Sequence, residues 1–253
     1  MLETKTIVLV HGYMNNARVW DEWIPYLQRS GYTVHAPSWL YMDAPISQLQ
    51  VNPDARLGQV TFGEVVEHYA SFIQSLPEKP ILIGHSLGGV MVQKLAELGY
   101  AAAAVAVNSG PPAGISVMNL GWLVSNIQLL APWSKAPARL MNQKWYHRYV
   151  CQDLSFEETG QMMREFCVPA GARIPATIQP IDWSKSHVPL LFIAGSRDAS
   201  QPPAVNFKNY NAYTDPGSVK DYIQIQGRTH NTLRQDGWEY VADTILLWLR
   251  GLD

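Results

Sequence analysis

Six short apolar runs recur along the chain, and the segments between them carry apolar residues at helical spacing. Most of the runs lack polar–apolar alternation, which is typical of parallel strands buried on both faces. Strands that alternate with helices in this way predict an α/β fold with a doubly wound, mostly parallel sheet of about six strands. The expected strands are residues 6–10, 33–36, 80–83, 103–107, 189–194 and 221–225.

Helix signals support the same architecture. Thr61 and Glu64 form a capping box at the start of a segment whose apolar residues fall on one helical face. Residues 87–98 and 238–249 also have the pattern of helices. We therefore expect helices to cover both faces of the sheet.

The alternation of strands and helices stops between residues 113 and 187, where no convincing strand occurs. Ser155 and Glu158 form a second capping box inside this stretch. The pattern predicts a helical cap inserted over the sheet, not an independent domain. The core is then expected to consist of residues 1–112 and 188–253.

Composition narrows the classes of function. The 253 residues carry a net charge of −2, with 47% hydrophobic and 16% charged residues, as in one large globular domain. This charge favours neither nucleic acid nor an anionic membrane, and no apolar run reaches the roughly 20 residues that span a bilayer. Without a signal-peptide pattern, a cytoplasmic location is expected. Cys151 and Cys167 are expected to be free thiols, and the oligomeric state stays open.

Residues 84–88 read Gly-His-Ser-Leu-Gly, a G-x-S-x-G motif between an expected buried strand and an apolar helix. In this context the motif predicts a nucleophile elbow, a sharp turn that presents the Ser86 hydroxyl above the sheet. The flanking glycines remove side chains that would collide with neighbouring elements. Ser86 is therefore the candidate nucleophile.

A serine nucleophile needs a base, and the base needs a carboxylate to orient it. Of the seven histidines, His230 lies in a polar loop after the last expected strand. Asp198 follows the fifth strand, whereas Asp182 precedes that strand and lies at its wrong end. Since α/β sheets form their sites at the carboxyl ends of strands, Asp198 and His230 are the expected partners of Ser86.

An oxyanion needs hydrogen-bond donors. The backbone N–H of Leu87 is one candidate, and the loop after the first strand should supply another from Tyr13, with Met14 as the alternative. His11, in the same loop, is expected to be structural. The sequence contains no metal-binding motif and no dinucleotide-binding motif, so no metal and no cofactor are expected.

Together these motifs resemble the α/β-hydrolase superfamily over essentially the full length. The resemblance implies a capped serine esterase or lactonase, with residues 113–187 as its cap. Ser86 stands where epoxide hydrolases and haloalkane dehalogenases carry aspartate, so the resemblance implies acyl transfer. The family's sheet has two strands before the first one expected here, and this chain has only five residues there. The matching pieces are the His11–Gly12 turn and residues 84–89, 195–198 and 227–230.

The expected partner is a small-molecule substrate, a small to medium hydrophobic ester or lactone, because the cap is rich in apolar side chains and no charged cluster stands out. Expected substrate contacts are Met14, His85, Trp39, Trp122 and Trp145. Further residues expected near the pocket are Tyr41, Met118, Trp133, Met141, Tyr146, Phe156, Met162 and Met163.

Other functions fit the same residues. C–C bond hydrolysis, amide hydrolysis, perhydrolysis and hydroxynitrile cleavage all occur on such a triad, because a fold does not fix its chemistry. A signalling protein that binds a ligand with little turnover is the alternative from another class.

Overall fold

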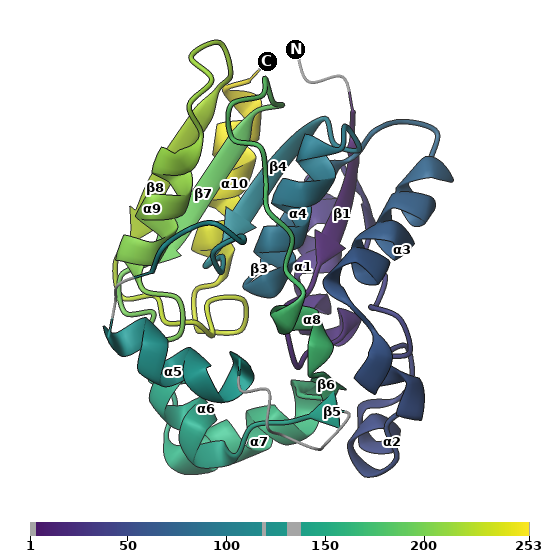
Figure 1. The fold of residues 1–253 in the computed structure, drawn as a ribbon, viewed down its shortest axis with the longest axis vertical. Helices are drawn as coiled ribbons and strands as arrows, with labels where there is room; N and C mark the ends of the chain where they lie inside the picture. The colour runs from purple at the N-terminus through teal and green to yellow at the C-terminus, as the bar shows by residue number, and fades with distance from the viewer. Residues whose placement is uncertain (1–3, 118–119, 131–137, 253) are drawn as a thin grey trace.

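The computed structural model describes residues 4–117, 120–130 and 138–252. Its centre is a six-stranded sheet in the order β2-β1-β3-β4-β7-β8, and every neighbouring pair is parallel (Figure 1). This arrangement confirms the predicted doubly wound sheet. The strands are β1 (Thr6–Val10), β2 (Thr33–His35), β3 (Ile81–His85), β4 (Ala103–Val107), β7 (Leu190–Gly195) and β8 (Lys220–Ile225).

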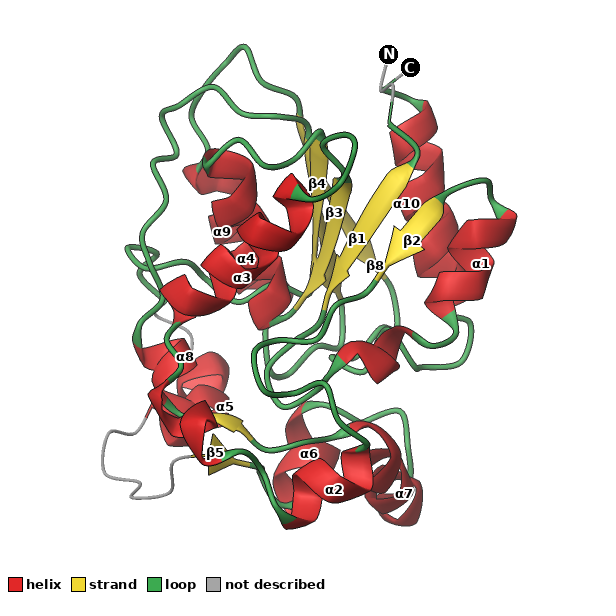
Figure 2. Ribbon diagram, turned by 90° about the vertical axis from the view of Figure 1, so that its right-hand side faces the viewer, coloured by secondary structure: helices red, strands yellow, loops and turns green. Residues whose placement is uncertain are grey.

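The sheet lies between two layers of helices. Figure 2 shows α3 (Phe62–Gln74), α4 (Leu87–Glu97) and α9 (Pro203–Ala212) on one face. The helices α1 (Trp23–Arg29) and α10 (Glu239–Arg250) cover the other face. The predicted capping box at the start of α3 is present, with Thr61 and Glu64 bonding each other's backbone N–H groups.

The four central strands, β1, β3, β4 and β7, contribute side chains to two separate hydrophobic cores. Val8 and Val10 belong to the core under α3 and α4, whereas Ile7 and Leu9 belong to the core under α1 and α10. This alternation follows from the two-residue period of a strand. It explains why the strands read as continuous apolar runs, since both faces are buried.

Most of the stretch between β4 and β7 lies beyond the carboxyl ends of the strands, and its last part runs back along the molecule to the start of β7 (Figure 1). Its α7 begins at the predicted second capping box, formed by Ser155 and Glu158. The expectation that it contains no strand was wrong, because β5 and β6 form a two-residue antiparallel pair. The elements are α5 (Leu120–Leu130), β5 (Ala138–Arg139), α6 (Gln143–Tyr149), α7 (Phe156–Phe166), β6 (Ala170–Gly171) and α8 (Arg173–Ala176).

The elements from α5 to α8 form a layer over the sheet's carboxyl edge, called the covering layer below. The loop after β2 packs against this layer. Its short helix α2 (Ile46–Val51) packs against α7, where Gln50 donates hydrogen bonds to the carbonyls of Met163 and Cys167 at 3.0 and 2.7 Å. One 3-10 helix, Ala17–Trp20, lies in the loop between β1 and α1, and a second, Ala55–Gln59, lies between α2 and α3. Within the part of the chain that the structure describes, no helix is long and apolar enough to cross a membrane.

Candidate active site

Ser86 lies in the sharp turn between β3 and α4, with φ 57° and ψ −120°. A non-glycine residue in this left-handed region is strained, and such strain occurs mainly at functional sites. The flanking glycines make the turn possible. A Cβ on Gly84 would lie 2.2 Å from the Gly88 carbonyl oxygen, and one on Gly88 would lie 2.3 Å from that of Val10.

The structure brings the three predicted residues into one hydrogen-bonded chain. The Ser86 Oγ lies 2.9 Å from His230 Nε2, and His230 Nδ1 lies 2.7 Å from Asp198 Oδ2. These side chains come from three strand ends, after β3, β7 and β8. The Asp198 side chain is fully buried and the His230 side chain is 7% exposed, so the pair is shielded from water.

Backbone donors fix the Asp198 carboxylate. Its Oδ1 accepts hydrogen bonds from the N–H groups of Ser200 and Gln201 at 2.8 and 2.7 Å. This leaves Oδ2 to accept the Nδ1 proton of His230. The imidazole is therefore held in the tautomer whose Nε2 carries a free lone pair toward Ser86.

The backbone on either side of the imidazole is anchored to the core. Asn108 follows β4 with φ 45° and donates its Nδ2 proton to the Thr229 carbonyl at 2.9 Å, while its Oδ1 accepts from the Gly195 N–H. His85 Nε2 lies 3.0 Å from the His230 carbonyl oxygen, so it carries the ring proton. Burial and the neighbouring His230 hold the pKa of His85 well below its ordinary value, so its ring is neutral.

The loop after β1 approaches Ser86 closely. A Cβ on Gly12 would lie 3.0 Å from the Ser86 Cβ, so a glycine is needed at this position. The next residue is Tyr13, and Leu87 N–H heads helix α4. Among the described residues neither Tyr13 N–H nor Leu87 N–H has a backbone or side-chain acceptor. Both donors predicted for the oxyanion are thus unengaged at the site.

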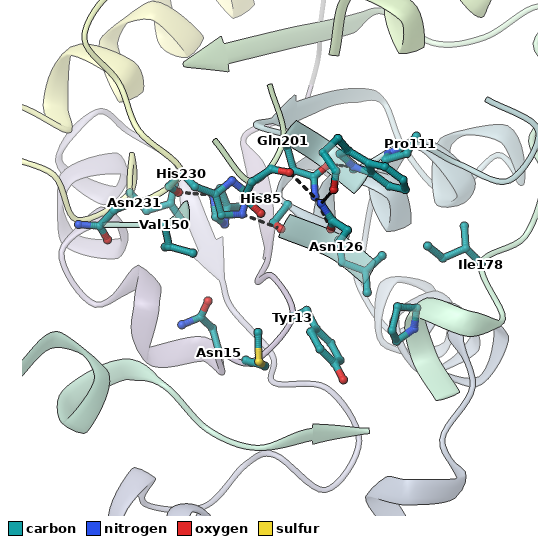
Figure 3. A pocket seen from close by; sticks show the side chains of 18 of the residues that line it. Tyr13, Asn15, His85, Pro111, Asn126, Val150, Ile178, Gln201, His230 and Asn231 are labelled. Atoms are coloured by element: carbon teal, nitrogen blue, oxygen red, sulfur yellow. Dashed lines mark hydrogen bonds between the residues drawn. The ribbon is translucent and has the colours of Figure 1, made fainter. Parts of the chain in front are cut away.

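A pocket of about 350 Å³ opens above Ser86. Figure 3 shows Tyr13, Asn15 and Val150 below the His85–His230 pair and Pro111, Asn126 and Ile178 to its right. The pocket walls come from the loop after β1, the loop after β4 and the covering layer. Most of the lining is apolar, including Trp122, Trp145, Tyr146, Met162 and Pro175.

Four of the five predicted substrate contacts line this pocket: Met14, His85, Trp122 and Trp145. The prediction for Trp39 was wrong. Its indole is 1% exposed and stacks on His11 in the core, with ring centroids 4.7 Å apart.

The further residues predicted near the pocket divide in a similar way. Tyr146 and Met162 line it. Phe156 is 48% exposed, Tyr41 lies under the Arg56 guanidinium, and neither belongs to the lining. Met141 and Met163 lie outside it as well, and Met118 and Trp133 fall outside the described residues.

Polar side chains in the lining bond to the protein. Trp122 Nε1 donates to Gln201 Oε1 at 2.9 Å, and Gln201 Nε2 donates to Asn126 Oδ1 at 3.2 Å. Asn126 in turn donates to the Ser200 carbonyl at 3.0 Å. This network ties α5 to the loop that carries Asp198. The described polar lining is thus largely occupied by internal bonds, which favours a ligand bound by apolar contact.

Several residues of the site were missed from the sequence. Asn108 directly follows a strand, so the rule that selected Asp198 also applies to it. Gln201 lies three residues after Asp198. No local signal marks Asp153, whose carboxylate reaches the His230 loop from the covering layer.

Two further predictions concern cysteines and metals. Cys151 and Cys167 are buried free thiols, as expected; burial raises the pKa of Cys167 to about 12. In the ranges 4–117, 120–130 and 138–252, no three His, Cys, Asp or Glu side chains are grouped to hold a metal ion.

The profile of the alpha/beta hydrolase family matches residues 7–244, nearly the whole chain. The chain belongs to this family. Among characterised proteins it is 30% identical to a pyrethroid hydrolase from Sphingobium wenxiniae over 91 residues. That match covers 36% of this chain and 30% of the relative, so it concerns only about a third of either protein.

Similar solved structures cover almost all of this α/β hydrolase. An extracellular α/β-hydrolase from a Paenibacillus species has a TM-score of 0.74 at 20% identity, with 95% of this chain and 97% of that one aligned. A methylesterase from Arabidopsis has a TM-score of 0.71 at 16% identity, covering 98% and 99%. A pyrethroid hydrolase has a TM-score of 0.70 at 20% identity, covering 96% of each. At these identities the likeness establishes the shared fold.

Proposed function

We propose that this α/β hydrolase cleaves small to medium hydrophobic carboxylic esters or lactones through an acyl-enzyme on Ser86. The observation that carries the proposal is the unbroken hydrogen-bonded chain from Asp198 through His230 to Ser86 beneath a mainly apolar pocket. A serine hydroxyl becomes a competent nucleophile when a positioned base removes its proton. His230 is that base.

The first half of the reaction acylates the enzyme. Ser86 Oγ attacks the substrate carbonyl carbon while His230 Nε2 takes the hydroxyl proton. The imidazolium that forms is stabilised by the Asp198 carboxylate, which lies 2.7 Å from Nδ1. His230 then gives the proton to the departing alcohol oxygen, and the C–O bond breaks. In a lactone that alcohol stays attached to the acyl group.

The second half releases the acid. A water molecule loses a proton to His230 and attacks the acyl carbon, and the returned proton restores the Ser86 hydroxyl. In both halves the carbonyl oxygen gains negative charge. The N–H groups of Leu87 and Tyr13 supply hydrogen bonds there, and Met14 N–H is the alternative to Tyr13. Donors of this kind contribute much of the rate enhancement of acyl transfer.

The chemistry of the pocket argues for the substrate class. Its lining is mainly apolar, and its amide side chains are bonded to the protein. A hydrophobic acyl or alcohol group is favoured, since burying a charged group there would cost its hydration and the Arg234 guanidinium of the lining is already paired with Glu22. The relatives named pyrethroid hydrolase and methylesterase support ester cleavage.

The decisive experiment incubates the protein with p-nitrophenyl esters from acetate to decanoate and follows intact mass over time. Ser86→Ala is the test variant, and Ser30→Ala, at an exposed position after α1, is the matched control. We expect many turnovers in the wild type and the control, a transient acyl adduct, and none of these in Ser86→Ala.

Each alternative gives a different result. A stable adduct on Ser86 without turnover would favour a binding protein over an esterase. The absence of both adduct and turnover would point to C–C hydrolysis or hydroxynitrile cleavage on the same residues. Full activity in Ser86→Ala would remove the proposed nucleophile.

A further inference from the structure

His230 is flanked by two residues that share one carboxylate. Thr229 Oγ1 donates to Asp153 Oδ1 at 2.7 Å, and Asn231 Nδ2 donates to Asp153 Oδ2 at 3.0 Å. We infer that Asp153, on the loop between α6 and α7 of the covering layer, is a positioning residue that sets the orientation of His230. The inference rests on the proposed role of His230 as base.

A second contact from the same loop strengthens this link. Asn231 N–H donates to the Val150 carbonyl at 3.0 Å and lies 3.2 Å from Thr229 Oγ1. The Thr229 hydroxyl therefore donates a hydrogen bond to Asp153 and accepts one from the Asn231 N–H. The backbone on both sides of His230 is closed into one hydrogen-bonded ring with the covering layer.

Further anchors of the loop come from the core and from Gln235, whose Oε1 accepts from the Thr229 N–H at 3.0 Å. Asn108 holds the Thr229 carbonyl and His85 holds the His230 carbonyl, both from the core. The covering layer holds the loop by the Thr229 hydroxyl and by the amide groups of Asn231. Without Asp153 the loop keeps its anchors on the core and its bond to the Val150 carbonyl. It loses the two side-chain bonds, from Thr229 and Asn231, that fix its tilt beneath the pocket.

A small tilt of the His230 ring matters because the ring must keep two hydrogen bonds at once, one to Asp198 and one to Ser86. Its Nδ1 and Nε2 lie 2.7 and 2.9 Å from Asp198 and Ser86, and hydrogen bonds weaken steeply as they bend. Asp153 does not touch the reacting atoms, so it acts through His230 alone. Its loss is expected to slow the chemical step and to leave substrate binding nearly unchanged.

The alternative is that Asp153 only fastens the covering layer to the core. In that case its removal would loosen the pocket, raise KM and lower the unfolding temperature, with little direct effect on Ser86. The two roles can therefore be distinguished by kinetics: a positioning role lowers kcat, whereas a fastening role raises KM. They can also be distinguished by how fast Ser86 reacts with a small reagent that does not fill the pocket, because only a positioning role slows that reaction.

The test measures the second-order rate constant for labelling of Ser86 by a small alkyl fluorophosphonate, together with kcat and KM for a p-nitrophenyl ester. The variants are Asp153→Asn, Thr229→Val and the double variant. Glu157→Gln is the matched control, because this exposed carboxylate lies in the first turn of α7 in the same layer. Thermal unfolding of each variant is recorded in parallel.

We expect Asp153→Asn to lower the labelling rate and kcat by ten-fold or more, with KM within about two-fold of the wild type. Thr229→Val should have a similar effect, and the double variant should be no slower than the slower single variant, since both substitutions disrupt the same link between Asp153 and the His230 loop. Glu157→Gln should match the wild type.

Labelling of Asp153→Asn within two-fold of the wild type would overturn the inference. So would additive losses in the double variant, or a rise in KM with unchanged kcat. Labelling needs no natural substrate, so the two proposals can fail separately. A wild type that labels rapidly but hydrolyses no ester would refute the proposed function, and the labelling rates of the Asp153 variants would still test the positioning role.

Discussion

The imidazole of His11 accepts a hydrogen bond from the Trp39 backbone N–H at Nε2, 3.0 Å away, and stacks on the Trp39 indole. Nδ1 therefore carries the ring proton and donates it to the Gly12 carbonyl at 2.9 Å. This histidine fixes the loop that presents Tyr13 to Ser86. Its role is structural, as the sequence suggested, and it depends on the ring being neutral.

The neutral state of His11 predicts a pH dependence of stability. Burial lowers its pKa from 6.5 to about 3. Above pH 6.5 neither the folded nor the unfolded chain protonates it, and the full stability is present. As the pH falls from 6.5 toward 3, the unfolded chain takes up a proton that the folded chain does not, so stability falls by up to about 1.4 kcal/mol per pH unit from this group.

The comparison variant is His11→Phe, which keeps an aromatic ring but cannot titrate. At pH 7.5 it should be less stable than the wild type by about 2 kcal/mol, because the Trp39 N–H and the Gly12 carbonyl lose their partner. Urea unfolding at pH 7.5, 6 and 4.5 should show this difference shrinking as the pH falls. A constant difference would contradict the assignment of a neutral, buried His11.

Gly12→Ala tests the proposed oxyanion donor of the same loop. The added methyl group would meet the Ser86 Cβ at 3.0 Å and the His85 carbonyl oxygen at 3.2 Å. Relief of this contact moves Tyr13 N–H away from the site, and losing one such donor costs about 100-fold in kcat. The control is Gly217→Ala, where the nearest atom lies 3.8 Å from the new methyl group.

Steady-state kinetics with a p-nitrophenyl ester, paired with thermal unfolding, decides this prediction. A fall in kcat with a nearly unchanged unfolding temperature is the expected result. Wild-type kcat in Gly12→Ala would show that the loop after β1 supplies no donor to the oxyanion.

The sheet and the chain of Ser86, His230 and Asp198 could be predicted because local sequence determines them. Buried parallel strands read as apolar runs, the elbow needs its two glycines, and the ends of parallel strands converge at one edge. The same rule applies to Asn108, which directly follows β4.

Other features depend on contacts that the sequence does not encode locally. Asp153 meets Thr229 across 76 positions, and nothing near Asp153 marks it as a partner of the site. Strands β5 and β6 contain two residues each, which is too short for any periodicity. Trp39 follows the end of a strand, which is where site residues are expected, but its indole stacks on His11 and is buried in the core.

Asn108 is predicted to stabilise the site through both its side chain and its backbone. Asn108→Ala leaves the Gly195 N–H and the Thr229 carbonyl without partners and places alanine at φ 45°, at a cost of about 3 kcal/mol or more. Asn108→Gly loses the same bonds without the backbone strain and should be about 1 kcal/mol less destabilising. Urea unfolding of both variants gives the two costs, and equal losses would contradict the contribution of backbone strain.

Asp198→Asn should abolish most turnover while keeping the fold. Its Oδ1 can still accept from the Ser200 and Gln201 N–H groups, so the amide nitrogen then faces His230 Nδ1. That nitrogen donates, which forces Nδ1 to accept and moves the ring proton to Nε2. His230 in this tautomer cannot take a proton from Ser86, and kcat should fall by about 10⁴-fold.

Asp182→Asn is the matched control for this substitution, since Asp182 is exposed and precedes β7, at the opposite end of the strand that leads to Asp198. It should keep wild-type kcat. Fluorophosphonate labelling should slow in Asp198→Asn by a factor similar to the loss in kcat, because both reactions need the same proton transfer to His230. Rapid labelling of Ser86 in Asp198→Asn would mean that the carboxylate does not set the tautomer, and the order of proton transfer proposed for Ser86, His230 and Asp198 would have to be abandoned.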